Sequence, residues 1–349
     1  MPSPSRRPLL VATLVATAGL AHAGPERVLP GPAPQPRAEG YDVAAENHAC
    51  EGCHADIAAE WRGSLHHRAW DDPVFQTAYA LEPLPFCRGC HAPEADPARL
   101  PPEPARRLGV GCVTCHVSSG EILGVRGQTL APERNAVVAD ARLATPRACE
   151  RCHQFAFPEP QRAAMQGTIE EHHASKHAAE SCQACHMPLV ASANGTKHRS
   201  HDFRVLGDTS LLRSAVRARA WRSGERAVTV SLAAARVGHS FPTGDMFRQL
   251  EVRARVVGEG GARATPVLLR RHFQRVPGKN GPRRLQIGDD RLPPTGEARE
   301  VELLFPAALS GQTVRWEVAY QRMDAGMAAL WGVDPAADEV LVAEGVLAP

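Results

Sequence analysis

The pattern C-x-x-C-H occurs five times in this chain of 349 residues, and it constrains the fold more than any other feature. The copies are CEGCH at residues 50–54, CRGCH at 87–91, CVTCH at 112–116, CERCH at 149–153 and CQACH at 182–186. Two thiols at this spacing lie along one porphyrin edge within a single helical turn, and the next residue, a histidine, can bind the iron from below. The sequence therefore predicts five covalently bound haem c groups.

The motifs use all ten cysteines of the chain and supply one histidine each. The predicted attachment thiols are Cys50, Cys53, Cys87, Cys90, Cys112, Cys115, Cys149, Cys152, Cys182 and Cys185. The predicted proximal iron ligands are His54, His91, His116, His153 and His186. A zinc ribbon, a redox-active cysteine pair or a disulfide framework could each use paired cysteines. None of these requires a histidine after every second cysteine in five copies.

The N-terminus has the features of a secretory signal peptide over residues 1–23: a positively charged start, an apolar stretch at 9–20 and a small-residue cleavage site ending at Ala23. Residues 24–40 form a Pro-rich linker. An uncleaved anchor is the alternative, but the apolar stretch is short for crossing a bilayer. No other stretch is long and apolar enough to be a transmembrane segment, so we expect a periplasmic or otherwise extracytoplasmic protein.

The chain changes character near residue 205, which predicts an α+β protein of two domains. Residues 41–204 hold the motifs in short helical pieces broken by proline, and so irregular a backbone needs the porphyrins to fill its core. From residue 205 no cysteine occurs, and apolar residues alternate with polar ones, as at 250–256. We expect a mainly α/irregular pentahaem cytochrome c domain (41–204) followed by an antiparallel β-sandwich (205–349).

A second repeat nominates histidines for the other face of the haem irons. Residues 60–66 and 171–177 share E-x-x-x-S-x-H, and both are predicted to be amphipathic helix segments that present a histidine. His66 and His177 are therefore predicted distal ligands. The adjacent alternatives are His67, His172 and His173.

The sequence GHSFPTG at residues 238–244 nominates a further ligand. Here His239 lies between two glycines, and a proline stiffens the turn, so the histidine can project from the end of a sheet into a neighbouring domain. We predict that His239 binds a haem iron. An ordinary turn between strands with an incidental histidine is the alternative.

These residues resemble the multihaem cytochromes of the cytochrome c-554 type over about residues 46–203. The likeness lies in the run W-x-x-S-x-H ending at His66, in GVG before the third motif, in CQACHMP and in HRSHDF at residues 198–203. The resemblance implies a haem core related to those of hydroxylamine oxidoreductase and pentahaem nitrite reductase. It also implies a distal ligand at His201. The GHSFPTG loop with its β-domain is similar to an appendage of some of these cytochromes.

The chain also departs from these relatives. The named cytochrome has four haems, whereas five motifs occur here. No C-x-x-C-K motif of the nitrite reductase type is present, and only three tyrosines are available for a crosslink of the hydroxylamine oxidoreductase type.

The number of histidines available as second iron ligands favours electron transfer as the function. Ten histidines outside the motifs follow the signal peptide, twice what five irons need for a second ligand: His48, His66, His67, His172, His173, His177, His198, His201, His239 and His272. Two histidine ligands would leave no iron open to substrate. The implied partners are redox proteins such as other cytochromes and quinol-oxidising or terminal oxidoreductases. The absence of basic runs interleaved with aromatic residues argues against nucleic acid.

The alternative is a multihaem oxidoreductase with one open haem, acting on a small nitrogen or sulfur compound. It would need a proton donor near that iron, for which His48 and His272 are candidates. No catalytic residue is assigned.

Overall fold

The computed structural model describes residues 41–127, 136–157, 164–203, 205, 208–278, 283–334 and 339–349. The predicted signal peptide (1–23) and linker (24–40) lie outside the described residues. Within the described ranges, no helix combines the length and apolar character needed to cross a membrane.

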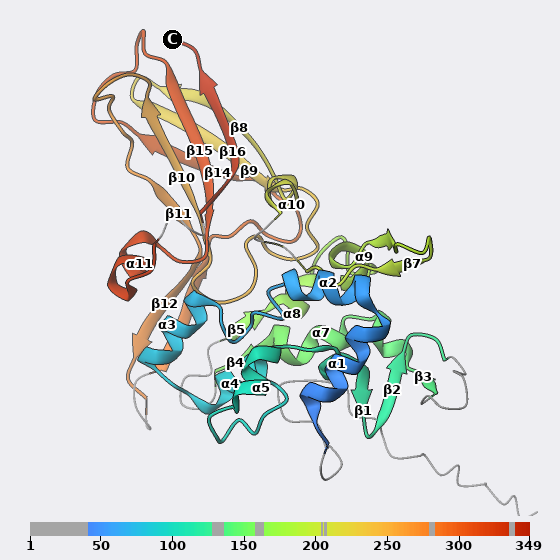
Figure 1. The fold of residues 1–349 in the computed structure, drawn as a ribbon. Helices are drawn as coiled ribbons and strands as arrows, with labels where there is room; N and C mark the ends of the chain where they lie inside the picture. The colour runs from blue at the N-terminus through green and yellow to red at the C-terminus, as the bar shows by residue number, and fades with distance from the viewer. Residues whose placement is uncertain are drawn as a thin grey trace, which may run out of the picture.

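The described residues from 41 to 203 form short helices joined by irregular segments, and small strands lie between them (Figure 1). The helices are α1 (Val43–Cys53), α2 (Ala55–Gly63), α3 (Pro73–Leu81), α4 (Pro85–His91), α5 (Glu103–Leu108), α6 (Cys112–His116), η1 (Ala141–Ala144), α7 (Arg147–His153), α8 (Thr168–His173) and α9 (Cys182–His186). The strands are β1 (Val117–Ser118), β2 (Glu121–Gly124), β3 (Val137–Ala139), β4 (Gln154–Ala156), β5 (Ala164–Gly167), β6 (Leu189–Ala191) and β7 (Lys197–Arg199).

Each C-x-x-C-H motif lies at the C-terminal end of a helix. Helices α4, α6, α7 and α9 end on the motif histidine itself. Helix α1 ends at Cys53, and the backbone N–H of His54 donates to the carbonyl of Cys50 at 2.9 Å. Both thiols of a motif therefore fall within about one helical turn, as the spacing predicts.

Buried apolar side chains in the first half form only small clusters. One consists of Trp61, Leu108, Val113 and Val117, and another of Trp70, Tyr79 and Ala92. Cores of this size are much smaller than the core of the second half. They agree with the expectation that porphyrins supply much of the apolar volume here.

The second half consists mainly of antiparallel strands. Its elements are α10 (Thr209–Ser214), β8 (Val216–Gly224), β9 (Ala227–Ala234), β10 (Gln249–Val256), β11 (Val267–Leu269), β12 (Arg271–Val276), β13 (Arg283–Asp289), β14 (Arg299–Leu304), β15 (Val314–Gln321), α11 (Ala325–Trp331) and β16 (Val340–Leu347). They form a four-stranded sheet β11-β10-β15-β16, a three-stranded sheet β14-β9-β8 and a two-stranded sheet β12-β13.

One core joins the three-stranded and four-stranded sheets. Val230 on β9 and Val252 on β10 are fully buried in it, and Val252 lies opposite the equally buried Val318 of β15. The predicted alternation of β10 appears as buried residues separated by half-buried ones. The β-branched and apolar residues from Val267 to Phe273 predict one strand, but this segment is divided into β11 and β12, and β12 pairs with β13 rather than β10. The fold is therefore a mixed α+β fold.

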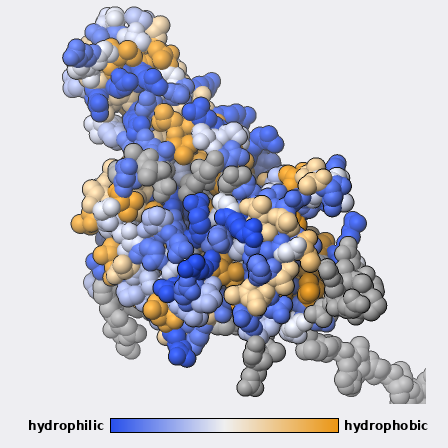
Figure 2. All heavy atoms as spheres, viewed as in Figure 1, coloured by the Kyte–Doolittle hydropathy of each residue, from blue (hydrophilic) through white to orange (hydrophobic). Residues whose placement is uncertain are grey.

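Figure 1 shows the two larger sheets projecting away from the helical half, while β12 and β13 extend back toward it. Among the described residues, two buried ion pairs join the halves: Arg322 with Asp72 at the start of α3, and Arg291 with Glu171 on α8. On the face seen in Figure 2, polar and apolar side chains are interspersed over both halves.

Candidate haem-binding sites

Three motif histidines each face a second histidine from a distant part of the chain. The pairs are His153 with His66 at 6.3 Å between ring centroids, His116 with His201 at 6.2 Å and His186 with His239 at 6.2 Å. Two imidazoles on one metal ion, with bonds of about 2 Å and ring centres about 1 Å beyond each nitrogen, have centroids about 6 Å apart. The observed separations therefore fit one iron between the two rings of each pair.

Hydrogen bonds at Nδ1 orient most of these rings and leave Nε2 for the metal. The bonds are His116 to the carbonyl of Leu123 at 2.9 Å, His153 to Oε1 of Gln166 at 3.2 Å, His201 to the carbonyl of Arg199 at 2.8 Å and His239 to the carbonyl of Ser240 at 2.9 Å. The carbonyl oxygens can only accept, so three of these rings carry their proton on Nδ1. This is the tautomer that binds iron through Nε2.

The electrostatics of the paired histidines favour the neutral imidazole. Burial, followed by the nearby imidazoles of His153, His201 and His186, lowers the pKa of His66 to about 3. Burial likewise lowers the pKa of His239 to about 4. Neutral imidazole is the form that binds a metal ion.

His177, the other histidine of the E-x-x-x-S-x-H repeat, has a buried nitrogen that is free to bind. Its Nδ1 donates to Oε1 of Glu180 at 2.6 Å, and its buried Nε2 has no hydrogen-bond partner within the described part of the chain. An unpaired buried nitrogen is costly unless another group completes it. The arrangement fits a metal ligand, although no ring pair with a motif histidine is found for His177 among the described residues.

The repeat histidines lie just beyond the helices rather than on them. Helix α2 ends at Gly63 and α8 at His173, so His66 and His177 both occupy the following turn. The sequence prediction of a helix through each histidine is wrong in this detail. The reason is local: Ser64 has an extended backbone, and its hydroxyl accepts from the N–H of His67.

The competing histidines have other contacts. Both nitrogens of His172 lie close to backbone carbonyls, Nδ1 2.8 Å from that of Gly238 and Nε2 2.9 Å from that of Glu180, and a neutral ring donates to one of the two. His198 likewise bonds to Ser192 and Glu60, and His272 bonds to Asp290. His48 and His173 are exposed. His67 packs edge-on against Trp61, and its buried Nδ1, like Nε2 of His177, has no hydrogen-bond partner within the described part of the chain.

The two remaining motif histidines have different surroundings. His91 donates from Nδ1 to the carbonyl of Ala69 and stacks on Phe75, with ring centroids 3.5 Å apart. His54 is exposed at the junction of α1 and α2. For neither is a facing histidine ring found within the described ranges.

Contacts between cysteines of different motifs show which motifs lie next to one another. Cys149 is hydrogen-bonded to Cys182, and Cys152 to Cys90, which raises the pKa of Cys149 and Cys152. Burial, followed by the charge of Cys152, raises the pKa of Cys115 to about 12. The fourth motif thus adjoins the second, third and fifth. The first motif adjoins the third, because Asn47 of α1, which also carries Cys50 and Cys53, accepts from the N–H of Cys112 at 2.7 Å. No disulfide joins the ten thiols.

Asn47, Gly109 and Gly111 position the third motif. The Oδ1 of Asn47 accepts from the N–H of Cys112 at 2.7 Å, and a side chain at Gly111 would collide with that amide. Gly109 has φ of +56° and packs directly on the carbonyls of His66 and His67. The GVG run is therefore a close backbone approach that only glycine allows.

The motifs, the facing histidines and the fold together define a multihaem c-type cytochrome with covalently bound haem c. Residues 49–117 match the family described as cytochrome c554 and c-prime, so the resemblance to the cytochrome c554 family is confirmed. No curated protein sequence matched the chain.

The fold is similar to that of a penta-heme cytochrome c552 from Thermochromatium tepidum, with a TM-score of 0.66 and 21% sequence identity. The alignment covers 88% of this chain and 99% of that chain. At this identity the likeness concerns the fold.

Proposed function

We propose that this chain is a pentahaem c-type cytochrome that transfers electrons between redox partner proteins through haems with mostly two histidine ligands. The observation that carries the proposal is the set of three histidine pairs with centroids 6.2–6.3 Å apart. Covalently bound haem supplies one-electron chemistry. A second histidine on each iron would occupy the position that a substrate needs. Five motifs in this chain and the penta-heme description of the structural relative support the number of five.

The pairs give a specific assignment of ligands. His66 serves the iron of the fourth motif, His201 that of the third and His239 that of the fifth. His177, with its unpaired Nε2, serves one of the two remaining motifs. The contacts between motifs support a branched arrangement, in which the fourth motif connects the second, third and fifth and the first is reached through the third.

The proposed organisation includes a signal peptide at residues 1–23, a linker at 24–40, a haem domain at 41–204 and a β-sandwich domain at 205–349. The shared core of the two larger sheets supports the β-sandwich, and the apolar stretch near the N-terminus supports export to the periplasm. Haem c is attached outside the cytoplasm, which agrees with that location. Other cytochromes and quinol-oxidising or terminal oxidoreductases are the proposed partners.

The EPR spectrum of the oxidised holoprotein tests this function, together with carbon monoxide binding to the reduced form. Haem content per chain is measured alongside by the pyridine haemochrome assay and intact mass. Five haems, low-spin signals alone and no carbon monoxide complex are expected for an electron carrier. A high-spin signal from about one fifth of the iron would contradict five closed irons.

The surroundings of two motif histidines support the oxidoreductase as a second candidate function. His54 and His91 face no histidine ring among the described residues, and two other histidines there have a buried ring nitrogen without a hydrogen-bond partner, His177 at Nε2 and His67 at Nδ1. If His177 closes one of these irons, the other is closed by a further ligand such as His67 or stays open. An open iron would support reduction or oxidation of a small nitrogen or sulfur compound, and nitrite and hydroxylamine are the substrates to try in that case.

A further inference from the structure

We propose that the glutamate of each E-x-x-x-S-x-H repeat is a positioning residue for a distal histidine on a different segment: Glu60 for His201, and Glu171 for His239. This inference rests on the proposed function, because it takes His201 and His239 as iron ligands. It gives the repeat a second role. Each copy supplies its own histidine and also fixes another one.

Glu60, on α2, binds the backbone of the histidine that it positions. Its Oε2 accepts from the backbone N–H of His201 at 2.8 Å, and its Oε1 is 3.1 Å from Nε2 of His198. His198 is itself held by Ser192, 2.7 Å from its Nδ1. The carboxylate thus fixes the chain on both sides of Ser200. Glu60 and His201 are 141 residues apart in the sequence.

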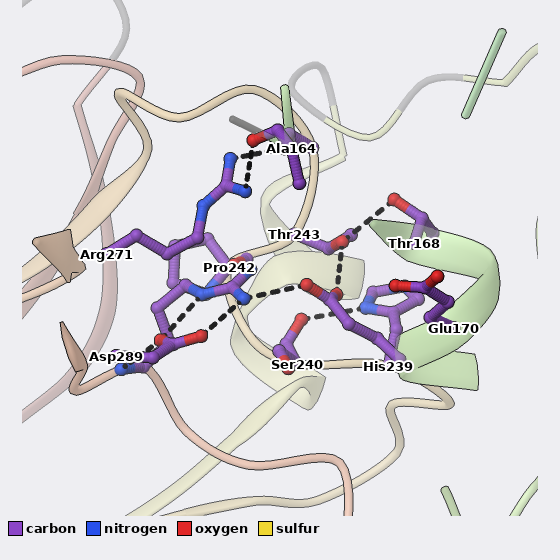
Figure 3. Close-up of polar contacts among 12 residues, drawn as sticks. Ala164, Thr168, Glu170, His239, Ser240, Pro242, Thr243, Arg271 and Asp289 are labelled. Atoms are coloured by element: carbon purple, nitrogen blue, oxygen red, sulfur yellow. Dashed lines mark hydrogen bonds and ion pairs between the residues drawn. The ribbon is translucent and has the colours of Figure 1, made fainter. Parts of the chain in front are cut away.

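Glu171, on α8, holds the GHSFPTG loop through two partners. Its Oε2 accepts from the hydroxyl of Thr243 at 2.6 Å, and its Oε1 accepts from Nη2 of Arg291 at 2.7 Å. Arg291 also donates from Nη1 to the carbonyl of Pro242 at 3.0 Å. The side chains of Arg291 and Glu171 are only 6% and 13% exposed, so water screens this pair little. Figure 3 shows His239 and Thr243 on this loop beside Thr168 of α8.

The residue after Glu171 holds the other side of the loop. His172 bonds through Nδ1 to the carbonyl of Gly238, directly before His239. The contact is close: a Cβ at Gly238 would lie 3.2 Å from that nitrogen and 3.3 Å from Cβ of His177. The loop is therefore fixed at Gly238 and at Thr243, and His239 lies between the two points.

The two copies of the repeat use the same two positions for similar purposes, although the atoms that they contact differ. The serine hydroxyl shapes the turn that carries the copy's own histidine, because Ser64 accepts from the N–H of His67 and Ser175 from that of His177. The glutamate, four residues earlier, reaches a segment distant in sequence. Exposed carboxylates contribute little to the stability of a fold, but the contacts of Glu60 and Glu171 are partly or largely buried.

The test counts open irons in variants of the full-length holoprotein, by high-spin EPR signal when oxidised and by carbon monoxide binding when reduced. Glu171→Ala should open one iron, and the same change added to His239→Ala should open no further iron. Combined with His201→Ala, it should open a second. Glu60→Ala should open one iron by itself, no further iron when added to His201→Ala, and a second iron when added to His239→Ala. Glutamine at either position retains an acceptor oxygen and should open a smaller fraction.

Arg322→Met is the matched control, because it removes the other buried ion pair between the halves without touching either loop. If it opens the same irons, general loosening explains the effect and the positioning role is wrong. If the histidine variants open one iron each and the glutamate variants open none, only the positioning role is refuted. If the histidine variants open none, the proposed ligation fails and the positioning role fails with it.

Discussion

Removing Arg322 should destabilise the protein strongly, since its partner is a buried carboxylate. Arg322 contacts Asp72 through two nitrogens, at 2.8 and 2.6 Å, and the two side chains are only 10% and 12% exposed. Breaking such a pair by removing one partner costs about 3–5 kcal/mol, because the remaining charge stays buried. We expect Arg322→Met to lower the free energy of unfolding by about 3 kcal/mol, near the lower end of that range, since methionine keeps most of the apolar contact.

The pH dependence gives an independent check of the same pair. Burial acts to raise the pKa of Asp72, but the hydrogen bonds and charge of Arg322 outweigh it and hold that pKa below its ordinary value. A carboxyl with a lowered pKa stabilises the fold above its unfolded pKa of about 3.9 and loses this contribution as the pH falls through the folded pKa. The difference between wild type and Arg322→Met should therefore shrink in acid.

The assay is denaturant unfolding of the holoprotein followed by far-UV circular dichroism, with a double-mutant cycle. Asp72→Asn keeps an oxygen for the N–H of Phe75, which Asp72 now caps at 3.1 Å, while it removes the charge. In the Asp72→Asn background, Arg322→Met should cost much less than in the wild type. An equal cost in both backgrounds, or a wild-type cost below about 0.5 kcal/mol, would refute the reasoning.

Three further predictions concern the histidines. His66→Met should retain covalent haem and raise the potential of one haem, because methionine–histidine ligation does so; a redox titration identical to wild type would remove His66 from the ligands. Gly109→Ala should lower the free energy of unfolding by more than about 1 kcal/mol, since φ is +56° and the new Cβ meets the carbonyl of His66; a thermal midpoint unchanged from wild type would count against it. Acidification from about pH 7 to about pH 4 should lower the urea concentration at the midpoint of unfolding. In the unfolded chain a histidine takes up a proton near pH 6.5, whereas in the folded protein His239, with a pKa of about 4, stays neutral until lower pH, so acid favours the unfolded state. A midpoint that rises in acid would contradict this sign.

Much of the chemistry could be predicted from local sequence patterns. Two cysteines and a histidine within one helical turn need no distant residue to define a haem attachment site. Alternation over residues 250–256 likewise predicts a strand, and β10 forms there. The single strand predicted from Val267 to Phe273 is wrong, because periodicity does not say which strand a segment pairs with, and the structure divides the segment at Arg270 into β11 and β12.

The candidate distal ligands could be nominated from the sequence but not paired. His66 and His239 were singled out by a repeat and by a loop, and each faces a motif histidine. The supporting residues had no recognisable signal: Asn47, Arg291 and the glutamates act through contacts with segments far away in the sequence.

The sequence by itself determined the kind of cofactor and the number of C-x-x-C-H motifs, because thioether attachment and proximal ligation use neighbouring residues. Only the tertiary structure decided which histidine faces which motif and which motifs adjoin one another. The reason is physical: a second histidine reaches its partner ring through the packing of α2, α8 and the 238–244 loop, and that packing depends on buried ion pairs and close backbone contacts between distant parts of the chain.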